Sequence, residues 1–180
     1  MPGSMQEHAS VITEERNHFL FLILFCLLCF GAFIYRLAEV PPYHTDENFY
    51  VESSKNMVES GDYITPVYQE KKRFAKPILF YWLVSVSYKI FGIGLFSARL
   101  ISALFGTLCI PLLYLLACRL FDRHTALLAA VLLPACYLHF QISRWVITDM
   151  TMNFFVLASF LFFIRGYQDK TERKRNFYMF

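Results

Sequence analysis

Apolar residues are gathered along this chain into long runs that polar stretches interrupt. The first run extends from Phe19 to Tyr35, and three later runs cover residues 96–121, 126–140 and 150–164. An apolar run of about 18 residues, rising 1.5 Å per residue, spans roughly 27 Å and can cross a thin hydrocarbon core. The pattern therefore predicts about four transmembrane helices.

Two shorter helices are predicted between the first two runs. Residues 47–58 place Tyr50, Ser54 and Met57 at helical spacing in an otherwise polar stretch, which is typical of a helix lying along the membrane interface. Residues 77–91 are apolar and aromatic, but the run is only about 15 residues long and ends in a glycine-rich turn. We expect a second interfacial helix there.

Composition supports a membrane protein. Of the 180 residues, 57% are apolar and only 17% are charged, which makes a water-soluble domain improbable. The net charge of +3 is small and dispersed, so the sequence shows no basic face of the kind that binds nucleic acid. All five cysteines fall inside apolar runs, which favours buried thiols over metal or redox sites.

The number of membrane crossings decides which charged residues share a face. If residues 77–91 do not cross the membrane, Asp46, Lys76, Arg144 and Asp149 all emerge on one side. If they do cross, a membrane separates Asp46 from Asp149. The short connections at residues 119–123 and 165–175 are basic, and the positive-inside rule then places both termini in the cytoplasm.

Five short motifs follow one another in a distinctive order. Together they closely resemble the N-terminal part of the GT-C membrane glycosyltransferases, in particular the bacterial aminoarabinose (lipid A) transferases and relatives of the protein O-mannosyltransferases. The resemblance covers residues 19–180 and departs from the family pattern at two positions, Ala75 and Ile78, where glutamate and a second proline are usual. The motifs are Asp46-Glu47, GDYITP at 61–66, KPILFYW at 76–82, ARL at 98–100, and Arg144 with TDM at 148–150.

The resemblance implies transfer of a sugar from a polyprenyl-phosphate carrier to a lipid, glycan or protein acceptor. A neutral hydroxyl is a poor nucleophile, so a carboxylate must take the acceptor's proton, and Asp46 holds the matching position. The leaving phosphate needs fixed positive charge, for which Lys76 and Arg144 are the candidates. Asp149 either orients these cations, contacts the acceptor, or only stabilises the start of the last helix.

Weaker candidates surround these four residues. Glu47, Tyr50 and Arg99 are expected near the site, although an arginine at a span edge equally often extends to the interface. His44 with Glu47 could hold a divalent cation, as in some relatives, but Ala75 removes a carboxylate that the pattern usually offers. Without the resemblance, Asp46, Lys76 and Arg144 would equally fit a solvated helix start and interfacial anchors.

The expected organisation is an all-α membrane protein of about four transmembrane and two interfacial helices. Residues 1–17 are predicted to be cytoplasmic, residues 18–164 to form the GT-C-like region with an outer catalytic loop at 36–95, and residues 165–180 to be a cytoplasmic basic segment. We expect a bacterial inner-membrane enzyme whose active face points outward and which continues beyond this chain.

A non-catalytic alternative is a small membrane protein, such as a transporter subunit or an assembly factor, that keeps the first GT-C helices. A transporter would place polar groups near the bilayer midplane, whereas the charges here lie at the span edges. This placement favours chemistry at the interface.

Overall fold

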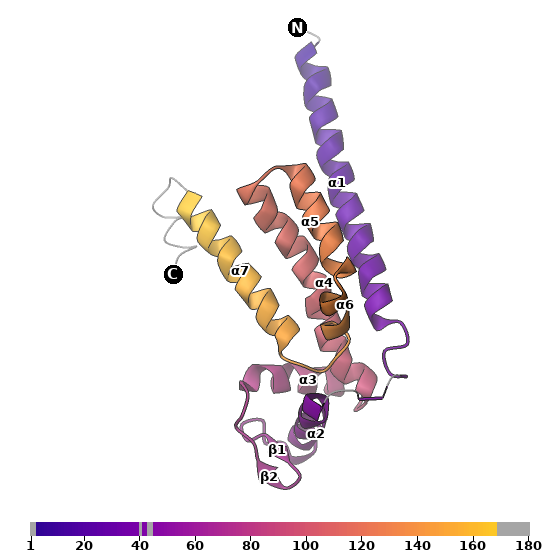
Figure 1. Cartoon of the computed structure of the whole chain (residues 1–180), viewed down its shortest axis with the longest axis vertical. Coiled ribbons are helices and arrows are strands. Elements are labelled where there is room, and N and C mark those ends of the chain that lie inside the picture. The colour runs from indigo at the N-terminus through magenta and orange to yellow at the C-terminus, as the bar shows by residue number, and fades with distance from the viewer. Residues whose placement is uncertain (1–2, 40, 43–44, 169–180) are drawn as a thin grey trace.

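The computed structural model describes residues 3–39, 41–42 and 45–168, and shows a helical bundle with a smaller layer across one of its ends (Figure 1). The bundle confirms the expected all-α membrane class. It contains α1 (Gly3–Ile34), α4 (Leu95–Leu120), α5 (Arg123–Ala135), α6 (Tyr137–Ile142) and α7 (Asp149–Gln168). The end layer contains α2 (Thr45–Ser60), α3 (Ile78–Phe91) and the strands β1 (Val67–Tyr68) and β2 (Lys71–Lys72).

Three bundle helices are long and apolar enough to cross a membrane. They are the Arg16–Ile34 part of α1, α4 and α7. Helix α4 is the central one, because it contacts α1, α3, α5, α6 and α7. Its buried small residues Ala98, Ala103 and Gly106 let the neighbouring backbones approach closely, as in other membrane helix pairs.

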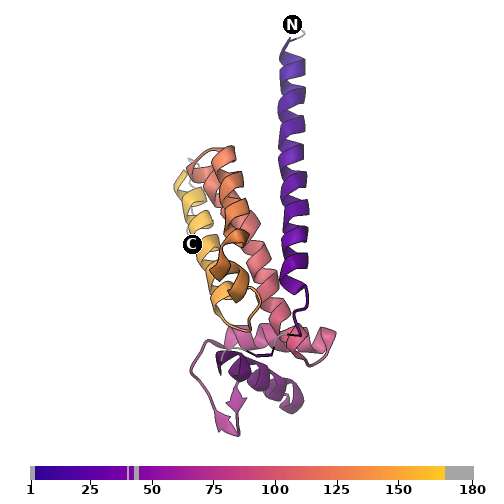
Figure 2. The same cartoon turned by 45° about the vertical axis from the view of Figure 1, so that its right-hand side comes forward.

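The span expected at residues 126–140 is not one continuous helix. Helix α5 ends at Ala135, Cys136 is extended (φ −66°, ψ 121°), and α6 then begins at Tyr137. Pro134 lies inside the last turn of α5, two residues before the break, and removes one N–H donor from that turn. The two pieces together still return the chain from the end of α4 to the opposite end of the bundle (Figures 1 and 2).

The turn between α4 and α5 is closed by an N-cap. The Asp122 carboxylate accepts hydrogen bonds from the backbone N–H groups of His124 and Thr125. These bonds and one from the Thr125 side chain lower the pKa of Asp122 to about 2. The cap is fully charged at neutral pH and fixes where the chain turns back.

Both additional helices of the first loop are present, close to their predicted bounds. Helices α2 and α3 lie across the end of the bundle rather than along it (Figure 2). Helix α3 begins directly after Pro77, a residue suited to a helix start, and ends at Phe91, just before Gly92, whose φ of 87° favours glycine. The short antiparallel hairpin β1–β2 between them was not predicted.

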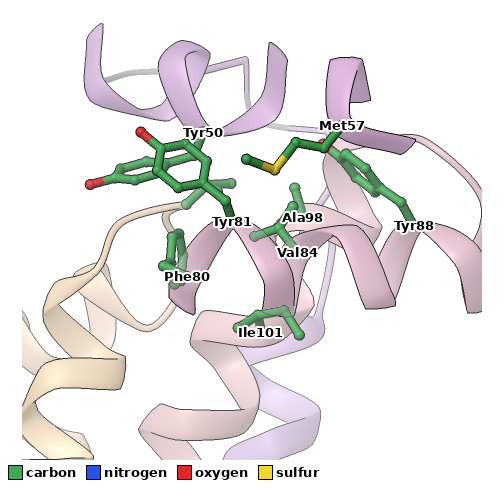
Figure 3. Packing of buried hydrophobic residues seen from close by; sticks show 9 residues of the cluster. Tyr50, Met57, Phe80, Tyr81, Val84, Tyr88, Ala98 and Ile101 are labelled. Atoms are coloured by element: carbon green, nitrogen blue, oxygen red, sulfur yellow. The ribbon is translucent and has the colours of Figure 1, made fainter. Parts of the chain in front are cut away.

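A buried cluster joins α2 and α3 to the start of α4 (Figure 3). Tyr50 of α2 packs its ring against Phe80 and Tyr81 of α3, with ring centroids 4.9 and 5.2 Å apart. Met57, Val84, Tyr88, Ala98, Ile101 and Val146 complete the cluster. Burial of these side chains holds the end layer on the bundle and positions the first turn of α2.

Candidate functional site

A buried ion pair lies beneath the first turn of α2. Glu47 is fully buried and Arg99 of α4 is 2% exposed. The Arg99 Nε and Nη2 atoms donate to the two Glu47 carboxylate oxygens, each at 2.9 Å. This bidentate geometry is the strongest form of a charge-assisted hydrogen bond. The pair fixes the start of α2 on α4.

The same pair gathers two other segments. Arg99 Nη1 donates to the Leu37 carbonyl at 2.8 Å, just after α1. Glu47 Oε1 accepts the backbone N–H of Val146 at 2.8 Å, in the loop that leads into α7. The end of α1 and the loop before α7 are thereby held against α2 and α4.

This arrangement brings Asp46 and Asp149 to the same end of the bundle. Asp46 is half-buried beside Glu47 in the first turn of α2, and Asp149 is exposed at the first residue of α7. Burial is the main cause that raises the pKa of Tyr50, one helical turn beyond Asp46, and the charges of both carboxylates raise it further. The structure therefore brings these three predicted residues together.

Two tyrosine hydroxyls lie at this position. Burial raises the pKa of Tyr50, against a side-chain hydrogen bond with Thr148 that lowers it. Burial likewise raises the pKa of Tyr81, whereas the positive charge of Arg73 and a side-chain hydrogen bond with it lower that pKa. Figure 3 shows both hydroxyls on the same side of the apolar cluster. Both side chains stay protonated at neutral pH and can donate hydrogen bonds.

Arg144 is bonded to the end of α1. Its Nη1 donates to the carbonyls of Ala32 (3.0 Å) and Phe33 (2.7 Å), and its Nη2 donates to the carbonyl of Tyr35 (2.9 Å). Carbonyls at a helix C-terminus lack helical partners and attract cations, so this is a favourable position for arginine. Burial, followed by the nearby charge of Arg99, lowers the pKa of Arg144.

Lys76 stands apart from these residues. It is exposed and lies in the loop just before α3. Within residues 3–39, 41–42 and 45–168, no hydrogen bond or ion pair joins it to Asp46 or Asp149. Its role as a phosphate ligand stays a prediction.

Two expectations for the weaker candidates need correction. Arg99 does not extend to the interface, because Glu47 holds it in the interior. Glu47 is poorly placed as a metal ligand, because both of its oxygens already accept hydrogen bonds. His44 lies outside the described residues, and those described include no group of three or more His, Cys, Asp or Glu that could hold a metal ion.

Sequence reasoning missed Arg73. Its guanidinium lies over the Phe49 ring, 3.5 Å from the ring centroid, and its charge acts on the Tyr81 hydroxyl. The available signal was its position in the basic run Lys71-Lys72-Arg73, only three residues before Lys76. Arg73 was missed because it lies outside the five motifs.

Curated and structural relatives agree with the resemblance found in the sequence. An uncharacterized protein of Aquifex aeolicus is 40% identical over 147 residues, which are 79% of this chain and 33% of that protein. The undecaprenyl phosphate-alpha-4-amino-4-deoxy-L-arabinose arabinosyl transferase of Erwinia tasmaniensis is 33% identical over 115 residues, which are 63% of this chain and 21% of that enzyme. The chain thus spans a third or less of these relatives.

Solved structures show the same likeness. Crystal structures of ArnT from Cupriavidus metallidurans, in the apo state and bound to undecaprenyl phosphate, match with a TM-score of 0.80 at 28% identity. The match covers 88% of this chain and 30% of ArnT. The family model for dolichyl-phosphate-mannose-protein mannosyltransferases matches residues 17–180. The chain therefore belongs to this family of GT-C membrane glycosyltransferases.

Proposed function

We propose that this chain forms the catalytic end of a glycosyltransferase that moves a sugar from a polyprenyl-phosphate carrier to an acceptor at the outer face of the membrane. The family membership and the similarity to an ArnT structure that holds undecaprenyl phosphate support the donor class. The observation that carries the proposal is the buried Glu47–Arg99 pair, which holds Asp46 beside Tyr50 and near Asp149.

In this proposal Asp46 is the general base. It takes the proton of the acceptor hydroxyl while that oxygen bonds to the anomeric carbon of the sugar. The bond from the anomeric carbon to the phosphate oxygen breaks at the same time, and the lipid phosphate leaves with the electron pair. Asp46 is suited to this because it is half-buried yet outside the Glu47–Arg99 pair. Asp149 assists by orienting the acceptor or a cation.

The leaving phosphate is assigned to positive side chains at the same end of the bundle. Lys76 is exposed in the loop just before α3, where a flexible ammonium can reach a substrate that lies over the end layer. Arg144 would reach a phosphate only by exchanging one of its carbonyl partners at the end of α1. Preorganised cations of this kind stabilise the charge that develops in the transition state.

The proposed orientation follows the positions of the helix ends. The loop at residues 36–95 and the Asp46 end would face outward from a bacterial inner membrane, and residues 1–17 and 165–180 would be cytoplasmic. The polyprenyl chain of the donor would remain among the membrane lipids while its phosphate reaches the end layer. The acceptor class is a lipid, a glycan or a protein.

The test is Asp46→Asn in the complete protein that contains this chain, reconstituted in proteoliposomes with an undecaprenyl phosphate-linked sugar. We expect sugar transfer to fall roughly 10²- to 10⁴-fold, the usual contribution of a general base. Binding of undecaprenyl phosphate should be retained. The matched control is Glu59→Gln, which changes an exposed carboxylate in the same helix. Transfer by Asp46→Asn at the wild-type rate would show that the base is elsewhere.

A further inference from the structure

Two of the cations expected near the site are engaged elsewhere. Arg99 is bonded to Glu47 in the interior, and Arg144 donates to three carbonyls at the end of α1. We propose that Arg73 is an anion-binding residue of this site and contacts a substrate phosphate beside Asp46. The inference rests on the proposed function and adds a residue that the motif pattern does not contain.

The hairpin fixes the position of Arg73. Its backbone N–H donates to the Pro66 carbonyl at 2.8 Å, which closes the chain just after β2. Its guanidinium lies 3.5 Å from the centroid of the Phe49 ring. The Phe49 ring also makes an edge contact with Tyr68 of β1, at a centroid distance of 4.6 Å. A guanidinium held on an aromatic face is preorganised and keeps its edge for hydrogen bonds.

Helix α2 places this guanidinium beside the predicted base. Phe49 lies three residues after Asp46, so the two side chains are neighbours on one face of α2. The Tyr81 hydroxyl is under the influence of both the Arg73 and the Asp46 charge. The aromatic anchor and the base therefore belong to the same turn of helix.

Two buried polar atoms at this point have unused hydrogen-bonding capacity. Tyr81 is fully buried, and the side chain of Arg73 interacts with its hydroxyl. Within the described part of the chain, neither the Arg73 Nε nor the Tyr81 hydroxyl has a further partner of strict hydrogen-bond geometry. Such atoms cost free energy unless a ligand or water satisfies them. Both groups can donate at neutral pH, so a ligand with several acceptor oxygens, such as a phosphate, fits this position.

Charge selects a phosphate among such groups. Asp46 and Asp149 both act on the Tyr50 hydroxyl, and on their own they would repel an anionic substrate. Arg73 is the positive group that acts on the adjacent Tyr81 hydroxyl. A guanidinium edge matches two phosphate oxygens at once, and a tyrosine hydroxyl can donate to a third. Arg73 thus offsets the carboxylates where the leaving group would develop charge.

The phosphate has two possible sources, the polyprenyl carrier and a phosphorylated glycolipid acceptor. The experiment measures equilibrium binding to the complete protein in nanodiscs. The probes are undecaprenyl phosphate, undecaprenol as its uncharged counterpart, and lipid A with and without its phosphates. The variants are Arg73→Gln, Arg73→Lys and the control Lys72→Gln, which removes the exposed cation one residue away.

We expect Arg73→Gln to weaken binding of one phosphorylated probe at least about tenfold and to leave its uncharged counterpart unchanged. Loss with undecaprenyl phosphate assigns the contact to the carrier, and loss with phosphorylated lipid A assigns it to the acceptor. Arg73→Lys should recover part of the affinity, because charge remains without the fork. Lys72→Gln should change affinity less than about twofold.

The outcomes separate this inference from the proposed function. If the wild-type protein binds the phosphorylated probes and Arg73→Gln binds them equally well, the inference is wrong and the proposed function is unaffected. A wild-type protein that binds neither phosphorylated probe overturns both. Circular dichroism and thermal unfolding show whether Arg73→Gln is folded. If it is not, Arg73→Lys takes its place in the binding measurement. Wild-type affinity in Arg73→Lys would contradict the bidentate contact.

Discussion

Glu47 and Arg99 lie 52 positions apart in the sequence and meet in the interior through both carboxylate oxygens, at 2.9 Å each. Their surroundings are the end of α1, the start of α2, the first turns of α4 and the loop before α7. Besides the two helices that carry it, the pair bonds to the segment after α1 and to the loop before α7. The pair therefore acts as the organising centre of the candidate site.

Breaking this pair on one side should destabilise the protein strongly. Arg99→Gln leaves the Glu47 carboxylate buried without its counter-ion, and we expect a loss of about 3–5 kcal/mol in the free energy of unfolding. The double variant Glu47→Gln with Arg99→Gln should lose much less than the sum of the two single variants, because no uncompensated charge remains. Thermal or denaturant unfolding in detergent measures all three.

The control for this cycle is the exposed pair Arg36 and Glu39, which lies at the same end of the bundle. Removing either partner should cost less than about 1 kcal/mol, because water screens both charges. Simple additivity of the Glu47 and Arg99 variants would contradict the direct coupling seen in the structure.

Arg144→Gln should loosen the end of α1. The change removes three hydrogen bonds from a charged donor to the carbonyls of Ala32, Phe33 and Tyr35. Because bonds to charged groups contribute about 1.5–3 kcal/mol, we expect a stability loss of that order. Amide hydrogen exchange in the last turn of α1 should become faster.

Arg119→Gln is the matched control, since it removes an exposed arginine from the last turn of α4. It should change stability by less than about 1 kcal/mol. Unchanged exchange at the end of α1 in Arg144→Gln would mean that the carbonyls find other donors. That result would mean that Arg144 can leave these carbonyls and bind a substrate phosphate.

Gly106→Ala should disturb the contact between α4 and α6. A Cβ atom at Gly106 would lie 2.2 Å from Ser143 Oγ and 2.8 Å from Ser143 Cβ, so one backbone must move. We expect a cost of about 1–3 kcal/mol, typical of overpacking. Introducing Ser143→Gly alongside it should remove the clash and make the two changes non-additive in unfolding measurements.

Gly31→Ala provides the comparison within α1. Among the described residues, no heavy atom outside the adjoining backbone of α1 lies within 4 Å of the Cβ position there, so alanine should be neutral or stabilising by about 0.5–1 kcal/mol through helix propensity. Equal effects at Gly31 and Gly106 would show that helix propensity, and not packing against Ser143, decides both.

Topology reporters should place the loop that contains Asp46 and the loop before α7 on the same side of the membrane. A reporter after residue 60 and another after residue 145 are expected on the same side, because α3 lies across the end of the bundle (Figure 2). A reporter after residue 122 should lie on the other side. Opposite locations for the first two would make residues 77–91 a membrane span.

The sequence alone determined the class of the protein and most of its helices. Long apolar runs have no stable alternative to helices in a lipid environment, so composition and run length were sufficient. The short apolar run at residues 77–91 was correctly assigned to the first loop because its length could not cover a bilayer. The break at Cys136 was missed, although Pro134 lies only two residues before it.

Only the tertiary structure decided what each charged residue does. Glu47 and Asp46 are adjacent and chemically alike, yet Glu47 is fully buried against Arg99, whereas Asp46 is half-buried and its charge raises the pKa of Tyr50 in addition to the effect of burial. The roles of Arg144 and Arg73 also differ because of their partners: Arg144 donates to carbonyls at the end of α1, whereas Arg73 lies over the Phe49 ring. The role of a charge depends on the partners that distant segments bring to it and on their exclusion of water, and neither is encoded in local residue spacing.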